Sequence, residues 1–264
     1  MPQVSHVVDI LKQFAPLELA EDWDNVGLLV GDPERPVQRV MTCLTLTPAT
    51  AAEAVRESAQ LVVSHHPVMF RPVQRLTTAD PQGKLLLDLA GAGVAVYSAH
   101  TAFDSAETGI NAHLALGLDL HGIQPLAVAD SPHAADVGAG RYGLVGESVR
   151  LEELVARVKS FLGIPTLRVV GPDDRTVQSV AIACGSGGSM LAHAASRRCD
   201  CMLTGEAAFH TCLEAEALGI SLILPGHYAS ERFAMEALAD YLGEQLPDVR
   251  VWASQDERDP LRQA

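Results

Sequence analysis

The sequence lacks an apolar run long enough to cross a membrane, because none approaches the roughly 18 residues that a spanning helix requires. Its first residues, Met1-Pro-Gln-Val-Ser-His6, also lack the basic start and the long apolar core of a secretory signal. These two absences predict a cytoplasmic protein that has no membrane partner.

Basic residues are scarce in this chain. Lysine and arginine together number 19 against 33 acidic residues, which gives a formal net charge of −14. The only adjacent basic pair is Arg197-Arg198. Because a protein that binds a phosphate backbone needs clustered positive charge, the composition argues against a nucleic-acid partner.

The five cysteines do not suggest a disulfide framework. An odd number without a secretory signal predicts reduced thiols. Cys199 and Cys201 are separated by one residue, so they could chelate a soft metal or mark the start of a buried strand. We favour the strand, because Cys-x-x-Cys is the usual zinc pattern. No serine or cysteine nucleophile motif stands out either.

What the sequence does have is a regular alternation of helical patterns and short apolar runs, which favours an α/β fold. Its 264 residues, 48% of them hydrophobic, suffice for two α/β lobes with buried cores. Strands are expected over residues 40–44, 61–63, 94–97, 167–170, 180–183, 201–203, 221–224 and 249–252.

A candidate linker divides the chain, because residues 127–140 are small, polar and without a period. We expect an N-terminal α/β lobe over residues 1–130, which contains a His-His-Pro loop and a His-x-x-x-Asp loop. The C-terminal α/β lobe then covers residues 131–264 and contains a Gly-His-x-x-x-Glu loop.

Three loops with metal-type ligands each follow an apolar run. Their ligands are His65 and His66, then His100 and Asp104, and finally His227 and Glu231. In open α/β sheets, ligands bind at the carboxyl ends of the strands. The pattern therefore predicts a metal site at the strand ends in the cleft.

The pair His65-His66 favours two ions over one. Adjacent residues of a strand point to opposite faces, so two imidazoles at a strand end should diverge toward two neighbouring ions. Two ions on three imidazoles and two carboxylates would keep positions open for water and substrate. His100 is expected outside the bound ligands, where it could orient a carboxylate or a water.

Each loop also has a structural explanation without metal. The two adjacent histidines could simply be hydrogen-bonded at a strand end. Asp104 could cap a helix that includes residues 109–114, and Glu231 could stand in the first turn of the last helix, capped by Ser230.

The three motifs together resemble those of the GTP cyclohydrolase I type 2 homologue family, the Nif-three-like proteins. Similar motifs run in matching order along nearly the whole chain: Asp22-Trp-Asp-Asn25 with Gly27-Leu28, Ser64-His-His-Pro67, His100 with Asp104, Cys184-Gly-Ser-Gly187, Thr204-Gly-Glu206, and Gly226-His-Tyr-Ala-Ser-Glu231. The resemblance implies an α/β fold, a dinuclear metal site and a ring-shaped homohexamer. The matching metal ligands are His65, His66, Asp104, His227 and Glu231.

The chain departs from the family pattern at Thr45, where members often have an aspartate. Two weaker signals accompany the motifs. The glycine-rich residues 185–188 could cradle an anion or form a tight turn. Glu206 and His210 are four residues apart on an expected helix, where they could line the cleft or form a surface pair.

These observations favour a hydrolase that uses two divalent metal ions per subunit and acts on a nucleotide or a related small molecule, as the family label implies. Zinc, iron, manganese and nickel all suit imidazole and carboxylate ligands. Glu231 could bridge the ions or move protons. The alternative is a non-enzymatic protein that binds, regulates or delivers metal through protein partners.

Overall fold

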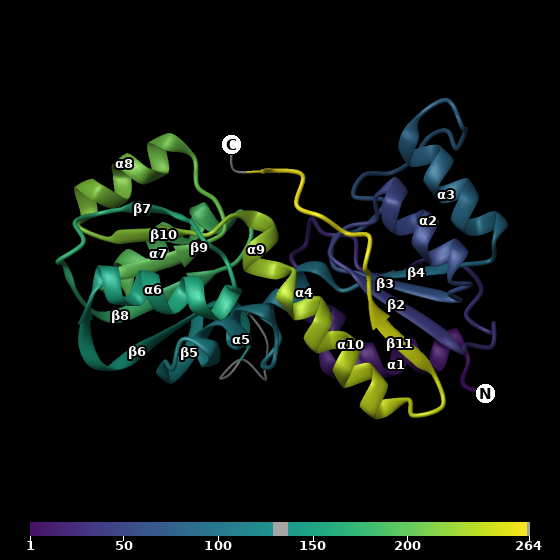
Figure 1. The fold of residues 1–264 in the computed structure, drawn as a ribbon, viewed down its shortest axis with the longest axis horizontal. Helices are drawn as coiled ribbons and strands as arrows, with labels where there is room; N and C mark the ends of the chain where they lie inside the picture. The colour runs from purple at the N-terminus through teal and green to yellow at the C-terminus, as the bar shows by residue number, and fades with distance from the viewer. Residues whose placement is uncertain (129–136, 263–264) are drawn as a thin grey trace. The chain divides into compact units, whose positions relative to one another are not determined.

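A computed structural model describes residues 1–128 and 137–262. It confirms the mixed α/β fold, with two sheets (Figure 1). The chain forms two compact units: unit 1 comprises Met1–Phe103 and Ala234–Ala264, and unit 2 comprises Asp104–Phe233. Within the described ranges, no helix has both the length and the apolar character needed to cross a membrane.

Unit 1 contains a five-stranded sheet in the order β1-β4-β3-β2-β11. All neighbours are parallel except β1 and β4, which are antiparallel. The elements of this unit are α1 (Val4–Phe14), η1 (Leu17–Leu19), β1 (Gly27–Val30), β2 (Arg39–Cys43), α2 (Pro48–Arg56), β3 (Leu61–Ser64), α3 (Pro81–Gly91), β4 (Ala95–Ser98), α10 (Phe233–Gln245) and β11 (Arg250–Ala253).

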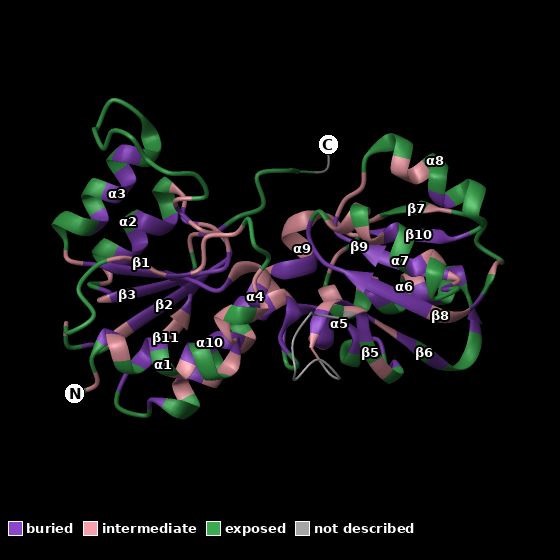
Figure 2. Cartoon of the chain, turned by 180° about the vertical axis from the view of Figure 1, so that it is seen from behind, coloured by how far each residue is buried: buried purple, intermediate pink, exposed green. Residues whose placement is uncertain are grey.

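Helices cover both faces of this sheet, so the central residues of its parallel strands are mostly apolar. Met41, Val62 and Val96 belong to the buried cluster that also contains the core side chains of α2 and α3. On the other face, the hydroxyl of Thr42 donates to Met235 O of α10 at 2.7 Å. Figure 2 shows these strands as buried and the outer surface of α3 as exposed. Parallel strands buried on both faces read as continuous apolar runs, which is why they were predictable.

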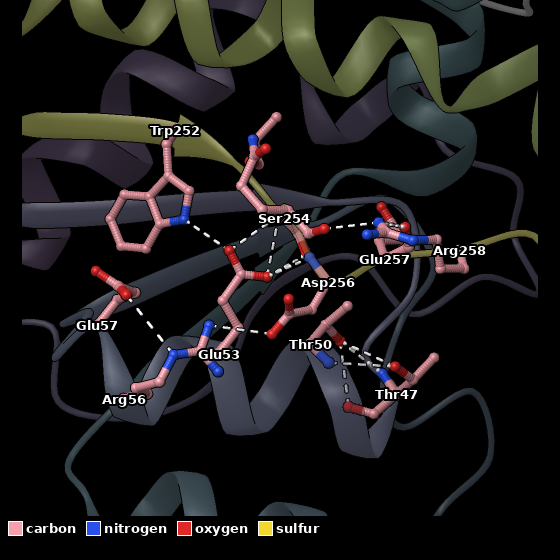
Figure 3. A network of polar contacts seen from close by, with 12 residues as sticks. Thr47, Thr50, Glu53, Arg56, Glu57, Trp252, Ser254, Asp256, Glu257 and Arg258 are labelled. Atoms are coloured by element: carbon pink, nitrogen blue, oxygen red, sulfur yellow. Dashed lines mark hydrogen bonds and ion pairs between the residues drawn. The ribbon is translucent and has the colours of Figure 1, made fainter.

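The segment after β11 is tied to α2 by one buried carboxylate (Figure 3). Glu53 accepts hydrogen bonds from Trp252 Nε1 at 3.0 Å, Ser254 Oγ at 2.5 Å, and the backbone nitrogens of Gln255 and Asp256 at 2.9 and 3.0 Å. Burial raises the pKa of Glu53, but these donors outweigh burial and lower the pKa below its usual value. Residues 252–257, which we call the tail of unit 1, are therefore held in one place.

Unit 2 contains a six-stranded sheet in the order β5-β6-β8-β9-β10-β7. Its three parallel strands are β8, β9 and β10, and the other neighbours are antiparallel. Its elements are α5 (Ile110–Gly117), β5 (His121–Val128), β6 (Gly138–Arg150), α6 (Leu151–Leu162), β7 (Arg168–Val170), β8 (Thr176–Ala183), η2 (Gly187–Met190), α7 (Leu191–Ser196), β9 (Cys201–Thr204), α8 (Phe209–Leu218), β10 (Ser221–Leu224) and α9 (His227–Glu231). Helix α4 (His100–Ser105) runs across the division between the units.

The predicted linker is in part a strand pair. Residues 129–136 lie outside the described residues, but on either side of them Ala127 pairs with Ala139 and Val128 with Gly138. The pattern was hidden because glycines interrupt β6. At Gly140, φ is +64° and a Cβ atom would lie 2.7 Å from Ile182 O, so this position of the strand needs glycine.

The two units differ from the expected lobes 1–130 and 131–264. Strand β5 precedes that boundary yet pairs with β6, and β11 at the end of the chain pairs with β2 in the first sheet. Strand pairing joins segments that are distant in sequence, so a single cut in the chain cannot separate the units.

Candidate metal centre

His65 and His66 follow β3, where the regular strand has ended. Consecutive backbone nitrogens of these residues donate to consecutive carbonyls, Cys43 O at 3.0 Å and Leu44 O at 2.9 Å. In a regular strand, successive residues alternate in direction. Here the two rings have centroids only 5.0 Å apart and planes tilted by 56°. The expectation that the two imidazoles diverge was therefore wrong, because the pleat does not extend to them.

Unit 1 brings three imidazoles together. One ring nitrogen from each of His65, His66 and His100 lies within 4.8 Å of the other two. Two nitrogen ligands of one tetrahedral zinc ion lie roughly 3.4 Å apart, since each Zn–N bond is about 2.1 Å. Side-chain shifts of less than an ångström would thus suffice to close this donor set on an ion. His100 had been expected to orient a ligand or a water from outside the metal ligands. In the structure it is one of the three candidate metal ligands of unit 1.

Asp24 holds His100 in place. Its buried carboxylate lies 2.7 Å from His100 Nδ1 and accepts from the backbone and hydroxyl of Thr101 at 3.1 and 2.5 Å. Burial raises the pKa of Asp24, but the hydrogen bonds from His100 and Thr101 outweigh it and lower the pKa to about 2. An ionised Asp24 accepts the proton of Nδ1, so His100 Nε2 keeps its lone pair for a metal.

Thr45 has the corresponding position beside His66. Its hydroxyl lies 2.7 Å from His66 Nδ1, so a neutral group stands beside this imidazole. Buried Glu257 fixes the Thr45 backbone by accepting from the nitrogens of Leu44 and Thr45 at 3.0 and 2.7 Å. Through Thr45, the tail of unit 1 supports His66.

Unit 2 brings His227 and Glu231 together at the start and the end of α9. His227 Nε2 lies 3.1 Å from Glu231 Oε2, and His227 Nδ1 lies 3.0 Å from Glu206 Oε1. Glu231 is only 3% exposed. Glu206 also accepts from Ser186 Oγ at 2.5 Å. One imidazole is thus held between two carboxylates.

Gly185 makes room for this pair. Its φ is +58°, and a Cβ atom there would overlap Glu231 Oε1 and lie 3.2 Å from His227 Nε2. Its backbone nitrogen donates to Ser230 Oγ at 3.0 Å. The glycine-rich turn thus serves the ligand pair. Ser230 lies inside α9 and does not cap α10, so the capping explanation for Glu231 is wrong.

Asp104 lies in α4 rather than at a cap, because the N-cap of α5 is Gly109 and has no side-chain bond. Cys184 donates its thiol proton to Asp104 Oδ1, with an Sγ–O distance of 3.2 Å. Burial, and after it the charges of Asp104 and Glu231, raise the pKa of Cys184 well above its usual value. Buried Asn111 joins the two, since it accepts from Cys184 N at 2.8 Å and donates to Asp104 O at 3.1 Å.

The pKa of His227 predicts a pH dependence for the metal-free protein. The hydrogen bond with Glu231 raises this pKa from 6.5 to about 9, against the opposing effect of burial. The folded protein binds the proton more tightly than the unfolded chain, so this contribution to stability is complete below pH 6.5 and is lost as the pH rises through about 9. We expect the thermal midpoint of chelator-treated protein to fall across this range.

The matched control is His227→Gln, which removes the titrating group. Thermal melts of both proteins between pH 6 and pH 9.5 test the prediction. Equal pH slopes in the two proteins would contradict it.

The structure thus forms two ligand sets from the predicted residues, His65 with His66 and His100 in unit 1, and His227 with Glu231 in unit 2. That both sets bind one pair of ions stays a prediction. Of the weaker candidates, Glu206 contacts His227, whereas His210 is exposed at the start of α8. Glu206 and His210 do not share a helix face as expected, because α8 begins only at Phe209 and Glu206 lies before it. Cys201 is the buried first residue of β9, as favoured.

Asp24, Glu206, Cys184 and Thr45 are partners of the candidate ligands, and of these only Glu206 had been considered from the sequence, as a residue that could line the cleft. The first three lie within motifs that carry the family resemblance, so those motifs were the sequence signal that could have identified them. Thr45 was visible only as a departure from the family pattern.

Comparison with known proteins agrees with the motifs. The family model Duf34/NIF3 (NGG1p interacting factor 3) matches residues 2–260. A Clostridium acetobutylicum protein named GTP cyclohydrolase 1 type 2 homolog is 33% identical over 98% of each chain. The Helicobacter pylori protein named GTP cyclohydrolase 1 type 2 is 34% identical over 88% of each chain. A solved Bacillus cereus protein related to NIF3 shares the fold, with a TM-score of 0.92 at 21% identity over 100% of this chain and 99% of that one. The chain belongs to the Duf34/NIF3 family.

Proposed function

We propose that this protein is a metal-dependent hydrolase that acts on a nucleotide or a related small molecule. The observation that supports this best is the cluster of three imidazoles, in which one ring nitrogen from each of His65, His66 and His100 lies within 4.8 Å of the other two. Thr45 and Asp24 engage the Nδ1 atoms of His66 and His100, which leaves the Nε2 atoms for a metal. Imidazoles oriented in this way are typical of metal ligands.

The proposed ligands of two divalent ions per subunit are His65, His66, Asp104, His227 and Glu231, with His100 as a further donor. Zinc, iron, manganese and nickel fit this set of nitrogen and oxygen donors. Bound ions would supply Lewis acidity and would lower the pKa of a coordinated water, which is the chemistry of hydrolysis.

The carboxylates of unit 2 suit proton transfer beside the ligands. Glu231 lies 3.1 Å from His227 Nε2, so a proton can be held between the two groups. Glu206 lies 3.0 Å from the other nitrogen, Nδ1, and orients the ring. If His227 Nε2 held a metal, Glu231 could bind the ion as well or accept a proton from a water.

Metal content is the primary test of the proposed site. Elemental analysis of protein purified without added metal should find about two divalent ions per chain. The variants His65→Ala and His227→Ala should each lose metal, and the double variant should lose nearly all of it. His210→Ala, which removes an exposed histidine, is the control and should keep the wild-type content. A double variant with wild-type metal content would overturn the ligand assignment.

Turnover separates the hydrolase from the alternative. Metal-loaded protein should hydrolyse GTP or a phosphoester, and the activity should disappear with a chelator and return with metal. Inert metal-loaded protein that transfers its metal to a recovered partner would favour the metal-delivery alternative. The homohexamer implied by the family resemblance is a separate proposal, and a monomeric mass in solution would contradict it.

Thr45→Val should weaken metal binding, because His66 loses the hydroxyl that holds its Nδ1 atom. Loss of such an orienting partner lowers metal affinity roughly tenfold or more. A titration against a competing chelator measures the affinity. Thr45→Ser keeps the hydroxyl and should bind as the wild type does, whereas equal affinity for the valine variant would show that Thr45 does not orient His66.

A further inference from the structure

Two exposed aromatic rings lie beside the imidazoles of unit 1. Trp23 is 59% exposed and Phe70 is 48% exposed. Their ring centroids are 5.7 Å apart and their planes are tilted by 55°. Both rings contact His100, with centroid distances of 6.1 and 6.3 Å. This aromatic pair, Trp23 and Phe70, therefore borders the proposed metal ligands.

Partly buried hydrogen bonds hold the segments that carry the aromatic pair. Asp24, which follows Trp23, is bound to His100 and Thr101. The amide of Asn25 donates to Met69 O at 2.6 Å, directly before Phe70. The segments on either side of the two rings are thus held by hydrogen bonds, while the rings themselves are exposed to solvent. Aromatic side chains are rigid, so they lose little entropy when a ligand covers them.

Two arginines, Arg71 and Arg75, lie shortly after Phe70 in the sequence. A recess of about 450 Å³ is lined by Phe70, Arg71, Arg75 and Gln82, among others. Its volume lies in the range of small-molecule sites. In the described parts of the chain, neither guanidinium has a hydrogen bond or an ion pair. Asp80 also lines the recess, but its carboxylate caps α3 by accepting from Gly83 N at 2.8 Å.

We propose that Trp23, Phe70, Arg71 and Arg75 form a recognition subsite for a planar heteroaromatic ring that bears an anionic group, as in a nucleoside phosphate. Exposed aromatic faces stack on such rings, and guanidinium groups bind phosphate. In a chain of net charge −14, these two arginines supply the local positive charge that a nucleotide needs. This proposal rests on the proposed function in one respect: the ring of the ligand would lie beside the imidazoles that we propose as metal ligands.

Tryptophan fluorescence provides the first test, because the chain has only two tryptophans. Trp252→Phe leaves Trp23 as the single reporter. GMP should quench its emission saturably, guanosine should quench it with lower affinity, and inorganic phosphate should leave it unchanged. Arg71→Ala with Arg75→Ala should remove the difference between GMP and guanosine. Quenching by none of the three probes would overturn the proposal.

Equilibrium dialysis with labelled GMP avoids the Trp252 substitution. Trp23→Leu and Phe70→Leu should each weaken GMP binding roughly ten- to hundredfold, as the loss of a stacking partner does. Phe209→Ala, which removes a ring that is 72% exposed in unit 2, is the control and should not change binding. Unchanged GMP affinity in both leucine variants would overturn the subsite, as would self-association that buries Trp23 and is insensitive to GMP.

Metal analysis of the same samples separates this proposal from the hydrolase proposal. Trp23→Leu with weakened GMP binding and wild-type metal content supports the subsite. His65→Ala with lowered metal content and intact GMP binding shows that the subsite is independent of the ions. If the wild-type protein binds GMP but holds no metal and shows no turnover, the subsite is supported and the hydrolase proposal is contradicted.

Discussion

Gly185→Ala is expected to lower the free energy of unfolding by about 3 kcal/mol, because a left-handed backbone costs about 1 kcal/mol and overpacking costs roughly 2 more. The backbone of Gly185 has a φ of +58°, and the added methyl group would overlap the Glu231 carboxylate. Because Glu231 is buried, it cannot move into solvent without a loss of packing. Denaturant unfolding of the metal-free variant measures the cost.

The same substitution should also lower the metal content, because the methyl group would lie 3.2 Å from His227 Nε2. Gly122→Ala is the matched control, since Gly122 has a φ of +60° and no atom within 4 Å of the position of a Cβ. It should show the backbone cost of about 1 kcal/mol alone and keep its metal. Equal losses of stability in the two variants would show that the crowding at Gly185 is unimportant.

Glu53→Gln is expected to lower the free energy of unfolding by about 3 kcal/mol, since it replaces a charged acceptor and turns an amide donor toward buried donors. Four donors from the tail of unit 1 converge on this carboxylate, among them Trp252 Nε1 and Ser254 Oγ (Figure 3). Urea unfolding at neutral pH measures the difference between the variant and the wild type.

The pH dependence gives this prediction a second measurement. Burial raises the pKa of Glu53, but the hydrogen bonds lower it further, so the carboxylate stabilises the fold above pH 4.5 and loses this effect as the pH falls through its depressed pKa. The gap between wild type and Glu53→Gln should therefore narrow below pH 4.5.

Glu57→Gln is the control one helical turn later. Glu57 makes exposed ion pairs with Arg56 and Arg250, at 3.7 and 3.2 Å. Exposed pairs of this kind contribute at most about 1 kcal/mol, so the variant should be nearly as stable as the wild type. A loss as large as that of Glu53→Gln would mean that the buried network has no special importance.

The parallel strands were predictable because burial on both faces leaves apolar runs in the sequence. Strands β3, β4, β9 and β10 lie where those runs are. Strand β6 was not recognised, because glycines such as Gly140 interrupt its alternation where neighbouring backbone comes close. The division into units was also unpredictable, since β11 pairs with β2 from the opposite end of the chain.

The ligand types of the candidate site were readable from three short motifs, but their partners were not. Asp24 meets His100 across 76 positions, and Thr45 meets His66 across 21. No periodicity connects such residues. His65 and His66 do not diverge as expected, because the regular strand already ends at Ser64.

The sequence by itself determined the fold class, the order of the ligand-bearing segments and the donor chemistry of each, because these depend on local pattern and residue type. Only the tertiary structure decided which imidazole nitrogens are held by partners, that His100 joins His65 and His66, and that Gly185 leaves space for Glu231. The physical reason is that hydrogen bonds and close contacts between distant segments are set by the packing of whole sheets and helices. Such packing leaves no short-range pattern in the sequence.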